Sequence, residues 1–355
     1  MTQEIVLRPN RRRRRRAPWL LLVLGLLLVS GWSWAWLEAQ RQAVRSTDAW
    51  FAAEAARGRP WSCSDRDISG FPFSFTLSCA QSTFTARIGG EQVEGQVAGL
   101  RAEASLMHPN RIRVTLASPM TAHRGEDTDP LELSWSGLSI EIGLTLAAEA
   151  RAAISADGLD IVRPDQRKAH IDHVGLQLAT AGLSGSSRRD YQVSAQLAGT
   201  AIPELDGATG TATPMVLDGR ATITGLELNG LEPWQDVVER WRLAGGRIEL
   251  ASLTYGKEPL RVAANGQLGL DELHRPTGLL QTTISGYETM AERLGLPLRA
   301  VSFGGALAGL LGGPTKPTAA AVNPGRSAMT LPVGFSGGRL TIGPFKTALR
   351  LAPLY

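Results

Sequence analysis

The spacing of apolar and polar positions changes twice along the chain. Residues 17–37 are almost entirely apolar and uncharged, whereas residues 38–57 mix alanine with charged and amide side chains and contain no glycine or proline. From about residue 60, apolar and polar positions alternate in short segments separated by turn-forming residues. These patterns predict, in order, a membrane-length helix, an exposed helix and a series of strands with one apolar face.

The first segment has the length and the flanking residues of a transmembrane helix. About twenty residues at a rise of about 1.5 Å match a hydrocarbon core of about 30 Å. Trp19 lies at one end and Trp32, Trp34 and Trp36 at the other, where indole rings favour the headgroup layers. We therefore predict that the segment spans a membrane and that these tryptophans help to anchor it.

Charge sets the orientation of this segment. Seven arginines, from Arg8 to the run Arg11–Arg16, precede it, while acidic and basic residues are mixed after it. The positive-inside rule then keeps residues 1–16 in the cytoplasm. Arg11 and Arg16 bound a run that also attracts anionic headgroups, at about 1 kcal/mol per residue near the surface.

A cleaved signal peptide is the alternative for this segment. Ser33-Trp34-Ala35 places small residues at the two positions that signal peptidase inspects. The apolar run exceeds the usual signal-peptide core of about 7–15 residues, which favours the uncleaved helix. The domain organisation expected is a basic tail (1–16), a membrane helix (17–37), a helical stalk (38–59) and a β-rich domain (60–355) with a break near 200–245.

The most specific local pattern follows the stalk. Phe71, Phe73, Phe75, Leu77 and Cys79 alternate with small or polar residues, which predicts a strand with one apolar face, entered through Gly70 and Pro72. A hairpin about Ser69-Gly70 brings Cys63 opposite Cys79 if the register allows. In an oxidising compartment the two would form a disulfide, worth about 3 kcal/mol for a loop of about 15 residues. Two reduced, buried cysteines are the alternative in a reducing one.

The order of these parts resembles a bacterial family, domain of unknown function family 2125. The resemblance rests on the N-terminal apolar helix, the segment Ser69–Phe73 with its Gly70-Phe71-Pro72-Phe73 core, the glycine-punctuated strands, and the terminal segment Gly338–Phe345. The layout is also similar to that of AsmA-type envelope proteins, whose long β-rich periplasmic part is implicated in lipid handling. The resemblance implies a single-pass protein of the bacterial inner membrane with its C-terminal domain in the periplasm, and it implies no catalytic residues.

The remaining chain predicts a mainly β fold of the α+β type, a long curved antiparallel sheet with a few covering helices. Alternating segments are expected as strands at 111–116, 131–135, 138–146, 174–178, 191–197, 221–228, 247–253 and 260–270. Covering helices are expected at Glu232–Leu243, Tyr287–Leu296 and Phe303–Leu311, followed by a flexible loop at 312–326.

Charge and local motifs do not support an enzyme or a nucleic-acid-binding protein. Beyond residue 16 the chain has 30 basic and 32 acidic residues, so it lacks the basic surface that phosphate binding needs. Gly334-Phe335-Ser336-Gly337-Gly338 fits a nucleophile elbow, but no histidine follows His274, and a strand turn is expected.

Three further look-alikes point to no metal or cofactor site. His170-Ile171-Asp172-His173 would hold a metal only on a helix; the alternation of its neighbours suggests a strand or a loop instead, and a solvated charged loop is expected. The acidic residues 126–129 lack the glycine and final glutamate of a calcium loop and predict a turn. The small-residue repeat Gly305–Gly309 is too short to span a membrane.

Two functions remain. In the first, the protein handles or contacts membrane lipid through an open apolar face of its sheet. In the second, the same face is sealed and the protein is a structural or interaction module of the cell envelope with a protein partner. Residues expected to line an open face are Ile140, Ile142, Leu144, Val193, Leu197, Ile223, Leu226 and Leu268. Alternation alone does not separate the two, because both need the same pattern.

Overall fold

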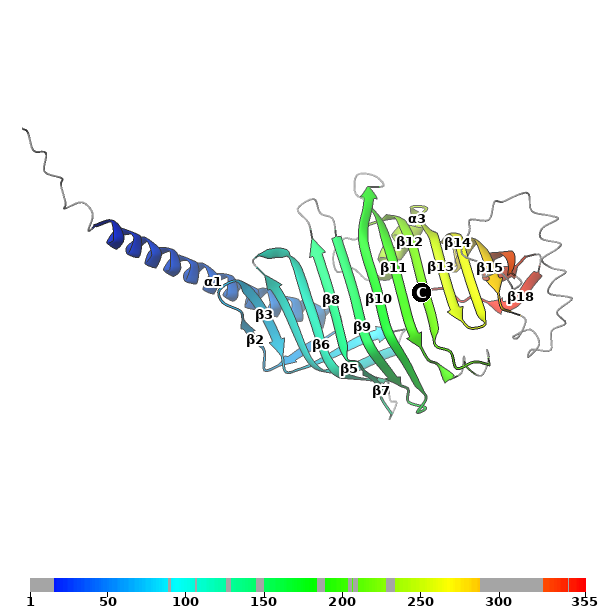
Figure 1. Ribbon diagram of the computed structural model, residues 1–355, viewed down its shortest axis with the longest axis horizontal. Helices are drawn as coiled ribbons and strands as arrows, with labels where there is room; N and C mark the ends of the chain where they lie inside the picture. The colour runs from blue at the N-terminus through cyan, green and yellow to red at the C-terminus, as the bar shows by residue number, and fades with distance from the viewer. Residues whose placement is uncertain are drawn as a thin grey trace, which may run out of the picture.

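The structure is a computed structural model in which one large antiparallel sheet is accompanied by two helices (Figure 1). It describes residues 16–88, 91–105, 107–125, 129–144, 150–183, 189–203, 206, 210–227, 234–287, 328–343 and 345–355. The predicted mainly β fold with an N-terminal apolar helix is confirmed.

Helix α1 (Arg16–Ala56) joins the expected membrane helix and stalk in one continuous helix of 41 residues. It is long and apolar enough to cross a membrane. It ends where Gly58 adopts a φ of 73° and Pro60 follows, as expected of these residues. Figure 1 shows its N-terminal half projecting away from the sheet, while its C-terminal half runs beside the first strands.

The first half of the sheet contains nine strands. They are β1 (Trp61–Ser64), β2 (Asp67–Ser69), β3 (Ser74–Cys79), β4 (Gln81–Ile88), β5 (Glu91–Ser105), β6 (His108–Arg124), β7 (Leu131–Ser134), β8 (Gly137–Leu144) and β9 (Ala150–Val162). Strands β3 and β4 lie end to end along one side of β5, and β2 and β1 pair with their outer edges. Strand β6 pairs with the other side of β5, and β7 and β8 lie end to end between β6 and β9.

The second half is a simple meander. Its strands are β10 (Lys168–Leu183), β11 (Arg189–Thr200), β12 (Met215–Leu226), β13 (Arg247–Lys257), β14 (Leu260–Leu270), β15 (Pro276–Ser285), β16 (Ala328–Ser336), β17 (Arg339–Ile342) and β18 (Phe345–Arg350). Each strand from β9 to β18 pairs with the next. Strand β12, which lies within residues 200–245, pairs with β11 on one side and β13 on the other, so the described strands before and after this region belong to one sheet.

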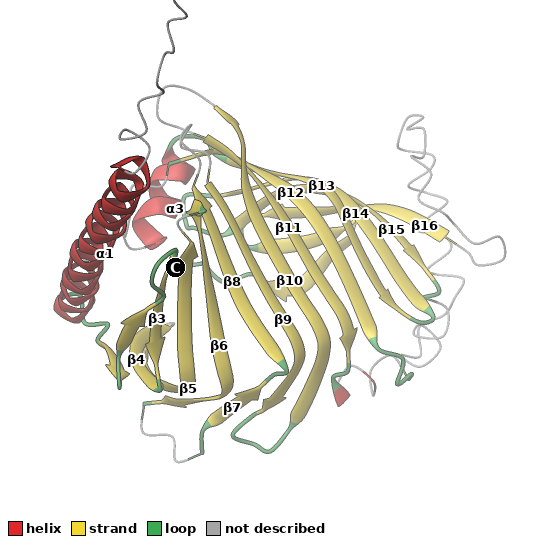
Figure 2. Cartoon of the chain, turned by 60° about the vertical axis from the view of Figure 1, so that its left-hand side comes forward, coloured by secondary structure: helices red, strands yellow, loops and turns green. Residues whose placement is uncertain are grey.

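A line of irregular positions crosses the first eleven strands. It includes the break at Ala80 between β3 and β4, the bulge between Val97 and Gly99, and the break between Ser134 and Gly137. It continues at Gly158 and Gly199, whose φ values are 57° and 64°. Because bulges and breaks bend strands and increase their twist, this line accounts for the strong curvature of the sheet in Figure 2.

The best-buried side chains of the first half lie near this line. Val97 is 2% exposed and Cys79 is 6% exposed. Trp135 is 9% exposed, and its indole Nε1 donates a hydrogen bond of 2.9 Å to the carbonyl of Leu116. The core of this half therefore follows the bend.

Helix α3 (Trp234–Leu243) confirms the helix predicted at 232–243. Trp241 is its buried residue, and its Nε1 donates a 2.8 Å hydrogen bond to the carbonyl of Thr224. A Cβ at Gly246 would lie 2.1 Å from this indole nitrogen, so glycine is required beneath the ring. The helix predicted at 287–296, apart from Tyr287, lies outside the described residues. Three further predicted segments also lie outside the described residues: the helix at 303–311, the loop at 312–326, and residues 126–128 of the acidic cluster.

The aromatic strand predicted from Phe71 begins later than expected. Residues Phe71–Phe73 form a turn, and β3 starts at Ser74. Gly70 has a φ of 111°, and both the amide and the hydroxyl of Ser74 donate to its carbonyl, at 3.0 and 2.9 Å. The turn therefore occupies residues Phe71–Phe73, which the alternating pattern had assigned to the strand. We call residues Gly70–Phe73 the hairpin tip.

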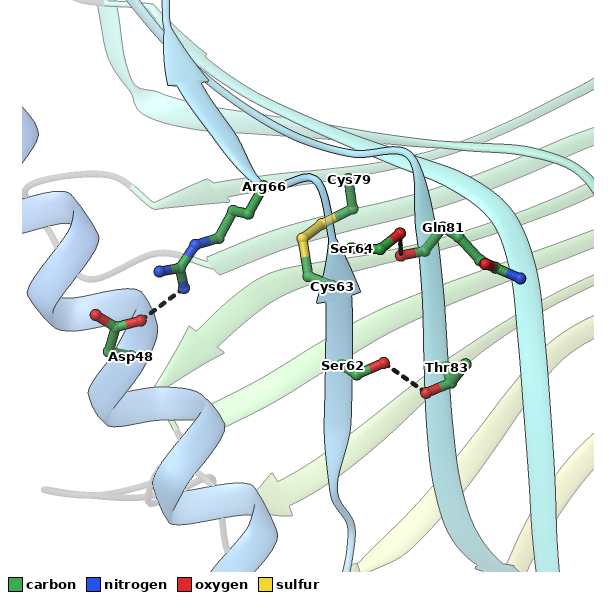
Figure 3. The surroundings of a disulfide bond; sticks show 8 residues. All are labelled: Asp48, Ser62, Cys63, Ser64, Arg66, Cys79, Gln81 and Thr83. Atoms are coloured by element: carbon green, nitrogen blue, oxygen red, sulfur yellow. Dashed lines mark hydrogen bonds and ion pairs between the residues drawn. A yellow bond between two sulfur atoms is a disulfide. The ribbon is translucent and has the colours of Figure 1, made fainter.

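Cys63 and Cys79 form a disulfide with a Cα–Cα distance of 5.3 Å (Figure 3). The expected hairpin is present, but by register Cys63 lies opposite Ser82 rather than Cys79. The break at Asp65 and Ala80 brings the two sulfur atoms together, since the Ala80 amide donates to the Ser64 carbonyl there at 3.0 Å. Beside the disulfide, Arg66 forms a 2.6 Å ion pair with Asp48 of α1.

Candidate functional site

Apolar residues form continuous rows across one face of the sheet. Residues that are directly opposite in antiparallel strands project from the same face, so the register defines each row. The first row contains Leu77, Ala102, Val114, Ile140, Ile154, Leu176, Ala195, Gly219, Leu253 and Ala264. The second contains Phe75, Ala104, Ile112, Ile142, Ala152, Leu178, Val193, Ala221, Leu250, Gly266, Leu280 and Val333.

A third row runs beside them from β8 to β16. It contains Leu138, Ala156, Val174, Leu197, Leu217, Tyr255, Val262, Ile284 and Met329. These three rows, which we call the apolar face, contain no charged side chain. The sheet therefore segregates its apolar residues onto one face over most of its width.

The opposite face is polar along the same strands. One of its rows contains Arg101, Thr115, Ser139, Ser155, Gly175, Gln196, Asp218, Thr254, Ala263, Thr283 and Thr330. Gln196 donates to Asp218 at 3.0 Å and Arg113 to Glu141 at 2.8 Å, each across a strand pair. A face of this chemistry is suited to water, and the apolar face is the one that needs a cover.

The centre of the apolar face is exposed. Ile112, Ile142, Ile154 and Leu176, on the successive strands β6, β8, β9 and β10, are 42%, 40%, 37% and 40% exposed. We call these four residues the open centre. On the same face towards the C-terminal strands, Ala264 and Leu280 are only 8% exposed. The open centre is thus a local property of β6–β10 and not of the whole face.

Half of the residues predicted to line an open face lie on these rows. Ile140, Ile142, Val193 and Leu197 belong to the apolar face. Ile223 and Leu268 belong to a further apolar row that also contains Tyr191 and Ile248. Leu226 leaves the pattern because Gly225, with a φ of 68°, interrupts the alternation. Leu144 belongs to β8, where its backbone pairs with Ala150.

Sequence reasoning missed Ile154, which is at the middle of the open centre. Its strand, β9, is rich in alanine and is interrupted by Gly158, so its alternation is weak. The available signal was its position between two clearly alternating segments, 138–146 and 174–178, which need a strand between them to form a meander.

Helix α1 covers the apolar face only at its first edge. Trp36 is 8% exposed, and its indole stacks on Phe75 with ring centroids 5.5 Å apart and an interplanar angle of 5°. Its Nε1 donates to the Ser74 carbonyl at 3.4 Å, and Gln40 donates to the Ile68 carbonyl at 2.6 Å. Trp36, one of the tryptophans predicted to anchor the membrane helix, is therefore packed against the sheet.

The other predicted anchor tryptophans remain exposed on α1. Trp19 and Trp34 are 70% and 68% exposed, and Trp32 is 45% exposed. Arg16 is the first residue of α1, and Arg11 lies outside the described residues. Exposed indoles at both ends of an apolar helix are the arrangement expected for a membrane span.

The His170–His173 segment belongs to strand β10, one of the two non-helical structures that its alternating neighbours suggest, and not to the expected charged loop. Its neighbours alternate strongly enough to keep the strand pairing through these polar positions. His170 contacts Asp160 at 2.7 Å and Asp172 at 3.0 Å, and these hydrogen bonds raise its pKa above 6.5. His173 instead pairs with Asp157 at 2.6 Å. The two imidazoles therefore have different carboxylate partners, and no group of three metal-binding side chains occurs among the described residues.

A charged cluster holds the C-terminus against α3. Glu239 accepts hydrogen bonds from Arg242 at 2.6 and 2.8 Å and from the Tyr355 hydroxyl at 2.8 Å, and these lower its pKa to about 2. The His274 and Tyr355 rings stack at 4.3 Å. A cavity of about 470 Å³ beside them is bordered by Arg275, Arg339 and Arg350. These three arginines distinguish the cavity from the apolar face, which has no charged side chain.

The nucleophile-like sequence is a strand turn, as predicted. Strand β16 ends at Ser336, Gly337 and Gly338 form the turn with φ values of 56° and 72°, and β17 begins at Arg339. A nucleophile elbow needs a helix after the serine, and here a strand follows.

Comparison with known proteins gives a family. The chain matches the family model described as "Uncharacterized protein conserved in bacteria (DUF2125)" over residues 36–349. No curated protein and no solved structure matches it. The match runs from Trp36, at the first edge of the apolar face, to the last strand, and so includes nearly the whole sheet. The chain therefore belongs to the DUF2125 family of uncharacterised bacterial proteins.

Proposed function

We propose that this protein is a membrane-anchored, non-enzymatic envelope protein that contacts lipid by holding an acyl chain on the open centre of its apolar face. The observation that carries the proposal is the exposure of Ile112, Ile142, Ile154 and Leu176 on successive strands. Large contiguous apolar patches are rare on soluble monomers and are typical of binding surfaces. At a strand spacing of about 4.8 Å, these four side chains cover roughly 14 Å, a length suited to an extended chain.

The energetics favour an acyl chain as the occupant. Each methylene removed from water contributes about 0.8 kcal/mol, so a long saturated chain gains enough to offset the cost of ordering it. The apolar rows carry no charged group, so they suit the hydrocarbon part of a lipid rather than its headgroup. The resemblance of the sequence layout to that of AsmA-type envelope proteins also motivates the proposal.

The orientation belongs to the same proposal. The arginine-rich tail favours a cytoplasmic N-terminus, and the Cys63–Cys79 disulfide is typical of an oxidising periplasm. A reporter that is active only in the periplasm should therefore work when fused after Leu354. Activity of a cytoplasm-only reporter at the same position would refute the orientation.

Photocrosslinking in cells tests the lipid contact. The photoreactive amino acid p-benzoylphenylalanine is placed in the full chain at Ile154, on the apolar face, or at Gln177, on the polar face of the next strand. After irradiation, mass spectrometry should detect a lipid adduct at position 154 and none at position 177. A protein adduct at position 154 without a lipid adduct would instead support the interaction module, and no adduct at either position would remove the basis for the lipid assignment.

A further inference from the structure

The hairpin tip presents two large aromatic side chains to the surroundings. Phe71 and Phe73 are 52% and 56% exposed. They flank Pro72, and no charged residue lies between Gly70 and Phe75. Paired exposed phenylalanines on a tight turn are unusual for a water-facing loop, and aromatic side chains of this kind are favoured at the boundary between headgroups and hydrocarbon.

The tip is fixed to the apolar part of α1. Trp32 donates from Nε1 to the Pro72 carbonyl at 3.1 Å, and its ring lies 6.1 Å from that of Phe73. The ring of Phe71 meets Trp36 edge to face at 5.4 Å. The tip therefore has a defined position along the helix axis.

That position falls within the candidate membrane span. Trp32 follows Pro18 by 14 residues and precedes Glu38, the first charged residue after the span, by six. At about 1.5 Å per residue these separations are about 21 Å and about 9 Å. With a hydrocarbon core of about 30 Å that ends near Glu38, Trp32 and the bound tip lie about 9 Å inside its outer boundary.

The tip is also continuous with the apolar face. Phe75 follows Phe73 by two residues and begins the row that continues through Ala104 and Ile112 to Ile142 of the open centre. Any surface that receives Phe71 and Phe73 therefore adjoins the start of this row.

We infer that the hairpin tip inserts into the leaflet from which α1 emerges, and that it seats the first edge of the apolar face on the surface of the phospholipid bilayer. The inference rests on the proposed anchoring by α1. It assigns to the Gly70-Phe71-Pro72-Phe73 motif a role in membrane contact, and it gives a lipid chain a short apolar path from the leaflet to the open centre.

Fluorescence quenching in lipid nanodiscs tests the insertion. Because Cys63 and Cys79 are bonded to each other and are the chain's two cysteines, a Phe73→Cys variant of the full chain has one free thiol for an environment-sensitive dye. Leu279→Cys is the matched control, because Leu279 is also 52% exposed but lies on the polar face of β15. Phe71→Cys serves as a second test position in case the first variant does not fold.

The expected results are opposite at the two sites. A dye at position 73 or 71 should be quenched severalfold more by nitroxide-labelled phospholipids than by aqueous iodide, and a dye at position 279 severalfold more by iodide. Iodide quenching at positions 73 and 71 as strong as that at 279 would overturn the inference. If Ile154 still forms a lipid adduct in that case, the acyl-binding proposal survives. N-terminal sequencing that shows removal of the residues before Trp36 would overturn both the anchoring and the insertion.

Discussion

The first edge and the centre of one sheet face differ in what covers them. At the edge, Phe75 stacks on Trp36 of α1, and the Trp36 side chain is 8% exposed. In the centre, Ile112 and Ile142 continue the row of Phe75 but are 42% and 40% exposed. The residues have the same character, and at the first edge the contact with α1 accounts for the difference in exposure. An apolar face that is buried at its first edge and towards its C-terminal strands but open at β6–β10 is a stable scaffold with a surface available for binding.

Replacing Trp36 should have the largest effect on stability. Truncation of a buried aromatic side chain costs about 3–5 kcal/mol, so Trp36→Ala should lower the free energy of unfolding of the full chain by this amount, measured by denaturant titration in detergent. Trp34→Ala is the control, because Trp34 is two residues away on the same helix and 68% exposed. Equal losses in the two variants would mean that α1 does not cover the edge.

Breaking the disulfide should have the next largest effect. Cys63 and Cys79 are 16 residues apart, and closing a loop of about this size contributes about 3 kcal/mol in the chain-entropy model. A Cys63→Ser/Cys79→Ser variant should lose about that much stability, and reduction of the native chain should give a similar loss. Two free thiols in the unreduced, alkylated protein would contradict the bond.

Substitution in the open centre should cost much less than substitution elsewhere on the same face. Leu280→Ala removes a side chain that is 8% exposed, and such changes cost about 2–5 kcal/mol. Ile154 is 37% exposed, so Ile154→Ala should cost about 1 kcal/mol. Measuring both by denaturant titration in lipid-free detergent sharpens the comparison, and a cost at position 154 equal to that at 280 would show that the centre is covered.

The smallest expected effect concerns His170. Asp160 and Asp172 raise its pKa above 6.5 through hydrogen bonds, so its protonation stabilises the folded chain. This contribution is complete below pH 6.5 and is lost as the pH rises through the raised pKa. An NMR titration should give a pKa above 6.5 that falls in Asp160→Asn. An unchanged pKa in that variant would show that the contact in the structure does not form in solution.

The sequence predicted the mainly β fold and the strands with the strongest alternation, because such segments have only one sensible secondary structure. It predicted no strand at β4, β5, β9 or β15, and it gave β6 and β10 only in part. It also predicted α3 and the disulfide pair, since Trp234 to Trp241 have helical spacing and the two cysteines have no other partner. It misplaced the start of β3, because alternation through Phe71 and Phe73 does not reveal the turn closed by Ser74 and Gly70.

The openness of the centre was beyond sequence reasoning for a physical reason. The exposure of Ile142 depends on where α1 lies relative to the sheet, and this depends on contacts such as Trp36 on Phe75 between segments far apart in the chain. Alternation determines which face is apolar, while tertiary packing determines whether that face is covered.

Selective protection of a thiol in the open centre tests the central claim most directly. Ile154→Cys and Gln177→Cys variants of the full chain, stripped of lipid in detergent, are reacted with an apolar maleimide before and after adding phospholipid. Both thiols should react without lipid, and lipid should slow the reaction at position 154 severalfold while leaving position 177 unchanged. A thiol at position 154 that fails to react without lipid, or that lipid does not protect, would contradict an open face that holds an acyl chain.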